Sequence, residues 1–163
     1  MSKIKYLIMD VDGTLTDGKI YMGNKGEFCK AFDVKDGYGI HNILISAGIV
    51  PVIITGRSSH ILENRCKELE IAMFYQGVKN KIEKVDEILN TTSYKYTYAN
   101  IAYIGDDIND LPAMKCIKAY GGLIGCPNDA VKQVKAIADY VSEKNGGNGA
   151  VREFIDWVLQ ISN

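Results

Sequence analysis

The alternation of apolar and amphipathic segments along the chain constrains its fold more than any other feature of the sequence. Apolar runs of strand length recur between stretches with helical periodicity, which is typical of a parallel sheet with helices on both faces. The predicted strands are residues 5–10, 49–55, 71–76, 100–106 and 116–122, with a possible short sixth at 138–143. The predicted helices lie near residues 37–47, 58–69, 79–91, 108–115, 127–134 and 149–161. The sequence therefore predicts an α/β protein with a three-layer, Rossmann-like arrangement.

One segment interrupts this alternation between the first predicted strand and the first predicted helix. In residues 18–35, a Gly-Asn-Lys-Gly turn at 23–26 lies between two short segments of strand-forming residues. This pattern predicts a β-hairpin that projects over the edge of the sheet. The chain has 163 residues, enough for one hydrophobic core but not for two, so we expect a single domain over residues 1–163.

The composition argues against several classes of partner. The chain has 19 basic and 20 acidic residues and a formal net charge of -1, which gives no electrostatic reason to bind nucleic acid or an anionic membrane. The four cysteines are widely separated and favour reduced thiols over a zinc site. The apolar run near the N-terminus ends at Asp10, too early for a signal peptide or a membrane span. We therefore expect a cytoplasmic protein.

Polar side chains follow four of the predicted strands. In chain order they are Asp10 and Asp12, then Thr55 and Arg57, then Lys81, and finally Asp106, Asp107 and Asp110. The carboxyl ends of parallel strands meet at one edge of a sheet, so we expect these groups to lie close together. Each alone has a structural interpretation, since Asp107 could cap a helix and Lys81 could be solvated. Together, clustered carboxylates need a cation, and a lysine and a hydroxyl beside Mg²⁺ suit a phosphoryl group.

These groups stand in four motifs that carry a family resemblance. The motifs are "DVDGT" (10–14), "IITGR" (53–57), a lysine that begins a helix, and "GDDIND" (105–110). In this order they resemble the haloacid dehalogenase (HAD) superfamily of phosphotransferases. The order differs from that of two-component receiver domains, in which the phosphorylated aspartate follows the middle strand. The resemblance implies a Mg²⁺-dependent phosphomonoester hydrolase.

The resemblance also implies a role for each motif residue in the reaction. Asp10 would attack phosphorus and form an aspartyl-phosphate, and Asp12 would act as general acid and then as general base. Thr55 would donate a hydrogen bond to a phosphoryl oxygen, and Lys81 would balance the charge of the phosphate and of Asp10.

The same resemblance implies a metal site. Asp10, the backbone carbonyl of Asp12 and Asp106 would bind Mg²⁺. Asp110 and Asp107 would orient the water molecules around the ion.

A narrower resemblance covers nearly the whole chain. The segments "DGKIYMGNKGE", "KAFDVKDGYGI", "YQGVKNK" and "GGNGAVREF" are similar to the capless branch of the superfamily that includes the 3-deoxy-D-manno-octulosonate 8-phosphate (KDO 8-phosphate) phosphatases. This likeness implies release of phosphate from an anionic sugar-acid phosphate. It also implies no cap domain, and a homotetramer in which neighbouring subunits cover each site.

The narrower resemblance assigns further residues to the substrate. Arg57 and Arg65 match the arginines that bind the sugar acid, although Arg65 could instead form a surface ion pair with Glu63 or Glu68. The matching substrate loop and the helix after it contribute Asp33, Val34, Lys35, Asp36, Gly37 and His41. His41 stands where related enzymes commonly have arginine, which leaves the sugar open.

The C-terminal segment carries one further expectation. The Gly-rich turn at residues 146–149 is expected to be a flexible joint, and the resemblance suggests that Arg152 reaches a neighbouring subunit.

Two alternative functions stay open. One is a phosphatase for a nine-carbon nonulosonate 9-phosphate, which would keep the chemistry and change the sugar. The other is a non-catalytic oligomerisation module like those appended to some sugar cytidylyltransferases. The second alternative predicts loss of the catalytic aspartates, yet Asp10, Asp12 and Asp106 are all present.

Overall fold

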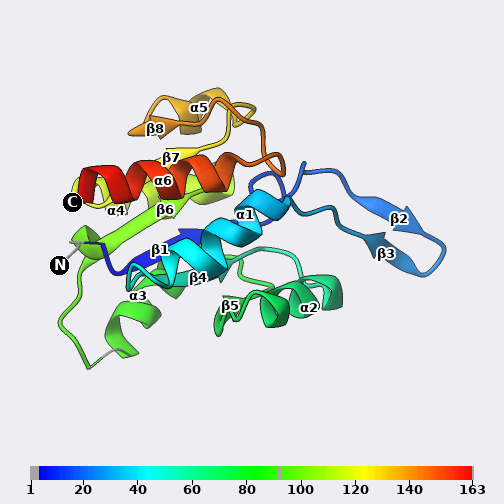
Figure 1. The fold of residues 1–163 in the computed structure, drawn as a ribbon, viewed down its shortest axis with the longest axis horizontal. Coiled ribbons are helices and arrows are strands. Elements are labelled where there is room, and N and C mark those ends of the chain that lie inside the picture. Colours follow the sequence, from blue (N-terminus) through cyan, green and yellow to red (C-terminus); the bar gives the residue numbers. More distant parts are fainter. Residues whose placement is uncertain (1–3, 92, 163) are drawn as a thin grey trace.

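A six-stranded parallel sheet forms the centre of the protein, as the sequence predicts. The computed structural model describes residues 4–91 and 93–162. The strand order is β5-β4-β1-β6-β7-β8, and all neighbouring strands run parallel (Figure 1). The strands of this sheet are β1 (Tyr6–Met9), β4 (Val50–Ile54), β5 (Met73–Tyr75), β6 (Ile101–Ile104), β7 (Leu123–Cys126) and β8 (Tyr140–Val141).

Helices cover both faces of the sheet. They are α1 (Val34–Tyr38), η1 (Gly39–Leu44), α2 (His60–Glu68), α3 (Lys81–Thr91), η2 (Tyr98–Asn100), η3 (Ile108–Asp110), α4 (Leu111–Ala119), α5 (Lys132–Lys135) and α6 (Ala150–Ser162). Apolar side chains of η1, α2 and α6 share one core with Leu7 and Met9 of β1. Those of α3, α4 and α5 share the other core with Tyr6 and Ile8. Alternate residues of β1 thus enter opposite cores, which explains why the whole strand is apolar and buried.

One predicted strand is wrong. Residues 116–119 form the last turn of α4, in which Ala113, Met114 and Ile117 are fully buried at helical spacing. The strand follows as β7, where the absence of a side chain at Gly125 makes room for the ring of Phe154. A Cβ atom at residue 125 would lie 2.4 Å from that ring. A short apolar run fits either periodicity, and here the packing of the two faces decides.

Several helix boundaries also differ from the prediction. The first helix begins earlier, at Val34, because the side chain of Asp33 caps it by accepting hydrogen bonds from the backbone of residues 35 and 36. It continues into η1, which has π-helical geometry. The helix predicted at 108–115 is a 3₁₀ turn followed by α4, and the one predicted at 127–134 is reduced to the short α5.

The predicted hairpin is confirmed. Strands β2 (Tyr21–Gly23) and β3 (Gly26–Cys29) pair antiparallel, and Figure 1 shows them projecting away from the rest of the fold. Met22 and Phe28 on this hairpin are 63% and 69% exposed. In the described residues between β1 and α1, β2 and β3 are the only strands.

Two findings bear on the expected environment of the protein. No helix in residues 4–91 or 93–162 has the length and apolar character needed to span a membrane. The four cysteines, all within the described residues, are free thiols.

Candidate active site

Three carboxylates converge at the carboxyl edge of the sheet. Asp10 follows β1 directly, Asp106 follows β6 after one glycine, and Asp110 ends η3. One oxygen of each carboxylate lies within 4.8 Å of the others. Asp10 is 4% exposed and Asp110 is fully buried, so their charges are only weakly screened by solvent.

Two glycines allow the chain to approach these carboxylates closely. Gly13 has a φ of +96°, and a Cβ atom there would lie 2.0 Å from a carboxylate oxygen of Asp106. The next residue, Thr14, donates a hydrogen bond of 2.8 Å from its hydroxyl to the other oxygen of Asp106. At Gly105, a Cβ atom would lie 2.5 Å from Cγ of Asp110. The short polar loops after β1 and β6 therefore pack closely against each other.

Lys81 forms ion pairs with two of the three carboxylates. It begins α3, is 3% exposed, and places its Nζ atom 2.7 Å from oxygens of both Asp10 and Asp110. Asp110 also accepts hydrogen bonds from the hydroxyl of Tyr103 and from the backbone amides of Asp106 and Asp107. Asp110 is thus engaged at both oxygens and holds Lys81 and the loop after β6 in place.

Burial and like charge shift the pKa values of this cluster. Burial, with the charge of Asp110 added, raises the pKa of Asp10 to about 7, although Lys81 opposes the rise. Burial and the charge of Asp10 raise the pKa of Asp106 to about 7, against the hydrogen bond from Thr14. Burial by itself lowers the pKa of Lys81, but the two carboxylates raise it on balance. One ammonium group is therefore too little positive charge for three carboxylates at neutral pH.

This deficit of positive charge fits a divalent metal ion. The donor set consists of carboxylate oxygens, which Mg²⁺ prefers, and the two groups with raised pKa values would ionise fully beside a cation. Because Asp110 already accepts four hydrogen bonds, Asp10 and Asp106 are the side chains best able to bind the ion directly.

The cluster opens into a hollow of about 280 Å³. Its lining includes Asp10, Asp12, Gly18, Thr55, Gly56, Arg57, Asp106, Asp107 and Asn109. Thr55 is buried directly after β4, at the same edge of the sheet as Asp10. Asp107 is exposed and caps η3 by accepting a hydrogen bond from the backbone of residue 108, which matches the capping interpretation of this residue. The hollow thus brings together residues from three of the four sequence motifs, with Lys81 of the remaining motif beneath it.

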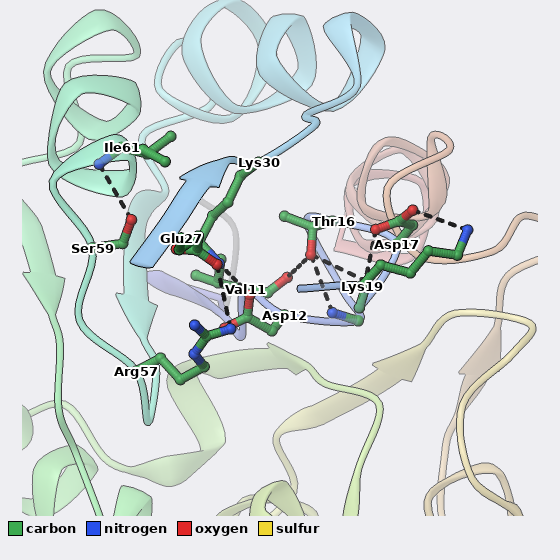
Figure 2. Close-up of polar contacts among 12 residues, drawn as sticks. Val11, Asp12, Thr16, Asp17, Lys19, Glu27, Lys30, Arg57, Ser59 and Ile61 are labelled. Atoms are coloured by element: carbon green, nitrogen blue, oxygen red, sulfur yellow. Dashed lines mark hydrogen bonds and ion pairs between the residues drawn. The ribbon is translucent and has the colours of Figure 1, made fainter. Parts of the chain in front are cut away.

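A network of charges that the sequence did not indicate surrounds Asp12. Figure 2 shows Lys30, Glu27 and Arg57 beside it. Lys30 pairs with the carboxylate of Asp12 and lies 3.0 Å from Glu27, which in turn lies 3.3 Å from Arg57. Nothing in the sequence distinguishes Lys30 from other lysines at strand ends. It reaches the site only because the fold brings the end of β3 beside the loop after β1.

The proposed substrate loop lies outside the lining of this hollow. Asp33 caps α1, and Asp36 is buried, with an oxygen 2.7 Å from the backbone nitrogen of Arg152 at the start of α6. Burial raises the pKa of Asp36 to about 6. Val34 and Lys35 are exposed, and Gly37 is buried. In this chain, Asp33 and Asp36 therefore have structural partners of their own.

Arg65 and His41 also lie apart from the three carboxylates. Arg65 pairs with Glu68 at 2.9 Å, as the ion-pair interpretation of this arginine expected. It also lies over the ring of Phe32. Glu63, the other expected partner, pairs with His60 instead. With Val34 and Gly37, Arg65 and His41 line a separate open hollow of about 320 Å³.

The glycine-rich turn at residues 146–149 is a packed structure, contrary to the flexible joint expected from sequence. A Cβ atom at Gly146 would lie 1.9 Å from the carbonyl oxygen of Gly13, and the amide of Gly147 bonds to the carbonyl of Thr14 at 3.1 Å. The turn therefore braces the loop that carries Asp12 and leads into α6. Arg152, which follows the turn, pairs with Asp156 on the same helix.

These pKa values predict that Mg²⁺ binding depends on pH. Without metal, Asp10 and Asp106 retain protons up to about pH 7 that the unfolded chain loses near pH 4, so these two groups contribute less stability as pH rises through this range. Because protons compete with the cation, Mg²⁺ affinity should be roughly thirtyfold or more weaker at pH 5.5 than at pH 8. Thermal unfolding with and without Mg²⁺ at both pH values measures this difference. Asp17→Asn, in the exposed loop before the hairpin, is the control and should respond to Mg²⁺ and pH like the wild type. If Mg²⁺ shifted the unfolding temperature of the wild type equally at both pH values, the assignment of the metal site would be contradicted.

Comparison with known proteins shows close relatives over nearly the whole chain. No family model matches the sequence. The chain is 46% identical over 156 residues to the 3-deoxy-D-manno-octulosonate 8-phosphate phosphatase KdsC of Salmonella typhi, covering 96% of this chain and 79% of that protein. The KdsC protein of Yersinia pestis is 45% identical over 158 residues, covering 97% of this chain and 81% of that protein.

Solved structures agree with this relationship. The crystal structure of the phosphatase from Yersinia pestis has a TM-score of 0.90 and 43% identity, covering 99% of this chain and 83% of that one. The Moraxella catarrhalis phosphatase, solved with magnesium, phosphate and KDO, has a TM-score of 0.90 and 38% identity, covering 99% and 89%. A putative HAD superfamily hydrolase from Legionella pneumophila has the same TM-score and identity, covering 99% and 85%. On this similarity, and with the four motifs gathered at one edge of the sheet, the chain belongs to the KDO 8-phosphate phosphatase family of the HAD superfamily.

Proposed function

We propose that this protein is a Mg²⁺-dependent phosphatase that converts KDO 8-phosphate to KDO and phosphate. The observation that carries the proposal is the buried cluster of Asp10, Asp106 and Asp110 joined by Lys81 beneath an open hollow. The names of the relatives supply the substrate, since proteins 46% identical to this chain are KDO 8-phosphate phosphatases.

In the first step, an oxygen of Asp10 attacks the phosphorus atom of the bound ester. The new bond joins Asp10 to phosphorus, the bond from phosphorus to the sugar oxygen breaks, and Asp12 gives its proton to that oxygen. Lys81, 2.7 Å from Asp10, holds the attacking carboxylate in place and balances charge that builds on the phosphoryl group. Thr55 lines the same hollow, and we assign to it a hydrogen bond donated to a phosphoryl oxygen.

In the second step, Asp12 accepts a proton from a water molecule, whose oxygen attacks the phosphorus of the aspartyl-phosphate. The bond to Asp10 breaks and phosphate leaves, which returns both carboxylates to their starting states. Asp10 and Asp12 suit these different tasks because they occupy different surroundings. Asp10 is buried beside Lys81, whereas the side chain of Asp12 is 18% exposed and paired with Lys30.

A bound Mg²⁺ ion would neutralise charge on the phosphoryl oxygens in both steps. Asp10, Asp106 and the backbone carbonyl of Asp12 would hold it. Asp110, and Asp107 on the rim, would not bind the ion but would orient the groups around it. Asp110 already holds Lys81 and two backbone amides.

Recognition of the sugar acid needs positive charge outside the metal site. Arg57 supplies it, because its side chain is 40% exposed and it lines the same hollow as Asp10 and Asp12. Within one chain, the hollow lined by His41 and Arg65 is separate from the hollow lined by Asp10. We therefore propose that these two residues and the loop at 33–37 complete the site in the assembled protein.

We further propose that the protein is a single domain that assembles as a homotetramer in the cytoplasm. The exposed apolar side chains of the hairpin, Met22 and Phe28, support an assembly in which a neighbouring subunit covers them. The free cysteines support a reducing compartment.

The substrate assignment predicts selectivity among phosphate esters. Phosphate release should be faster from KDO 8-phosphate than from a nonulosonate 9-phosphate, much faster than from p-nitrophenyl phosphate, and absent in excess chelator. Steady-state kcat/KM on the three esters measures this order. A higher kcat/KM on the nine-carbon ester would transfer the assignment to that substrate, and similar values on all three would exclude a dedicated sugar-acid enzyme.

The nucleophile assignment predicts the effect of Asp10→Asn. The amide keeps the shape of the side chain but cannot attack phosphorus, so kcat should fall by about 10⁴-fold or more. Removing one of three crowded carboxylates should leave the thermal unfolding temperature unchanged or raise it. Asp17→Asn serves as the matched control, and near-normal turnover by Asp10→Asn would show that another group attacks.

The assembly predicts a molar mass in solution of four chains of 18.0 kDa. Light scattering after size exclusion measures this mass. Phe28→Glu should lower it, because the added charge would have to be buried in a subunit contact. A wild-type protein that elutes as a monomer while hydrolysing KDO 8-phosphate would exclude the tetramer without affecting the activity.

A further inference from the structure

The hairpin and the acid–base residue are joined by a single buried lysine. We propose that Lys30 is a positioning residue that fixes the carboxylate of Asp12 and makes proton transfer depend on the position of the hairpin. This inference rests on the proposed function, because it assumes that Asp12 moves protons during hydrolysis.

The contacts of Lys30 connect three separate parts of the fold. Lys30 follows β3 directly, at the base of the hairpin, and its ammonium group pairs with Oδ1 of Asp12 after β1. It also lies 3.0 Å from Glu27 within β3, and Glu27 lies 3.3 Å from Arg57 after β4. Figure 2 shows these four side chains side by side. Strand β3 and the residue after it are therefore fastened to two strand ends that line the proposed active site.

The burial of this lysine separates it from an ordinary surface ion pair. Its side chain is 2% exposed and that of Glu27 is 9% exposed, whereas Lys19, which pairs with Asp17 at the start of the same segment, is 74% exposed. Placing an ammonium group out of water is costly unless its partners are well placed. A surface pair such as that of Lys19 adds little to stability or geometry. Lys30 is thus held in one position by two carboxylates, and it holds them in return.

This arrangement has a consequence for Asp12. Lys30 binds Oδ1, so Oδ2 is the oxygen we assign to proton exchange with the leaving group and with water. Lys30 itself is outside the lining of the hollow, so it acts through Asp12 rather than by touching the substrate. If the hairpin moved, the pair would break, and Asp12 would lose the contact that directs it. Lys30 should therefore affect turnover far more than substrate affinity.

The test compares Lys30→Met, Lys30→Arg and the control Lys19→Met in the assembled, full-length protein. Lys30→Met keeps most of the apolar stem and removes the charge, and kcat should fall roughly 10- to 100-fold, as for other partners that orient reacting groups. KM should change less than about threefold, and Lys30→Arg should restore part of the lost kcat. Lys19→Met should match the wild type. Hydrogen–deuterium exchange at the backbone amides of β2 and β3 should be faster in Lys30→Met than in the other variants.

Specific results would overturn the proposal. An unchanged kcat in Lys30→Met would show that Asp12 needs no partner, and a raised KM with normal kcat would make Lys30 a substrate-binding residue. If Lys30→Met does not fold, Glu27→Gln replaces it, since this change weakens the hairpin attachment while Lys30 still pairs with Asp12. Glu27→Gln should speed amide exchange in β2 and β3 and should lower kcat by less than Lys30→Met is expected to, and wild-type values for both would overturn the proposal.

Failure of the proposed function would be recognised separately. If the wild type hydrolyses p-nitrophenyl phosphate but not KDO 8-phosphate, the substrate assignment fails, and Lys30 is tested on the simpler ester. If the wild type hydrolyses neither, the activity assignment fails and the proton-transfer role of Lys30 fails with it. Amide exchange in β2 and β3 then tests only whether Lys30 fastens the hairpin.

Discussion

The contact of Lys81 with Asp10 and Asp110 is the interaction on which the site depends. A single ammonium group, almost fully buried, lies 2.7 Å from both carboxylates. It joins the end of β1, the start of α3 and the end of η3, three elements that are far apart in sequence. Without it, two buried carboxylates would face each other in a medium of low dielectric constant, which would strongly favour their protonation. The compensation is incomplete, and the remaining negative charge is what makes the site suitable for a divalent cation.

Close backbone packing keeps this charged cluster compact. Gly13 allows the loop after β1 to approach Asp106, and Gly105 allows the loop after β6 to approach Asp110. Gly146 packs directly against Gly13, so the turn before α6 supports the same loop. Side chains at Gly13 and Gly105 would collide with the carboxylates, and one at Gly146 would displace the loop after β1. This explains why small residues surround the most charged part of the molecule. The C-terminal helix is thereby connected to the site without contributing a side chain to it.

Each of the two neighbouring aspartates after β1 has its own lysine, and the two lysines come from different elements. Asp10 pairs with Lys81 of α3 in the protein interior, and Asp12 pairs with Lys30 of the hairpin nearer the surface. Two carboxylates that are only two residues apart thus have different surroundings, as the proposed nucleophile and the proposed acid–base group require. The hairpin is therefore part of the site's electrostatics as well as a flap beside it.

Local sequence patterns were enough to predict the fold class, the hairpin and the set of carboxylates at the strand ends. Hydrophobic periodicity and strand-end chemistry are properties of short segments, so Asp10, Thr55, Lys81 and Asp106 could be placed at one edge of the sheet from the sequence alone. Local pattern failed at residues 116–122, where helix and strand periodicities are equally compatible with a short apolar run. Three contacts arise only in the folded chain: Lys30 reaches Asp12, Asp36 meets the start of α6, and Gly146 packs on Gly13. Each of them joins residues from different elements, and their geometry depends on how those elements pack rather than on the residues next to them in the chain.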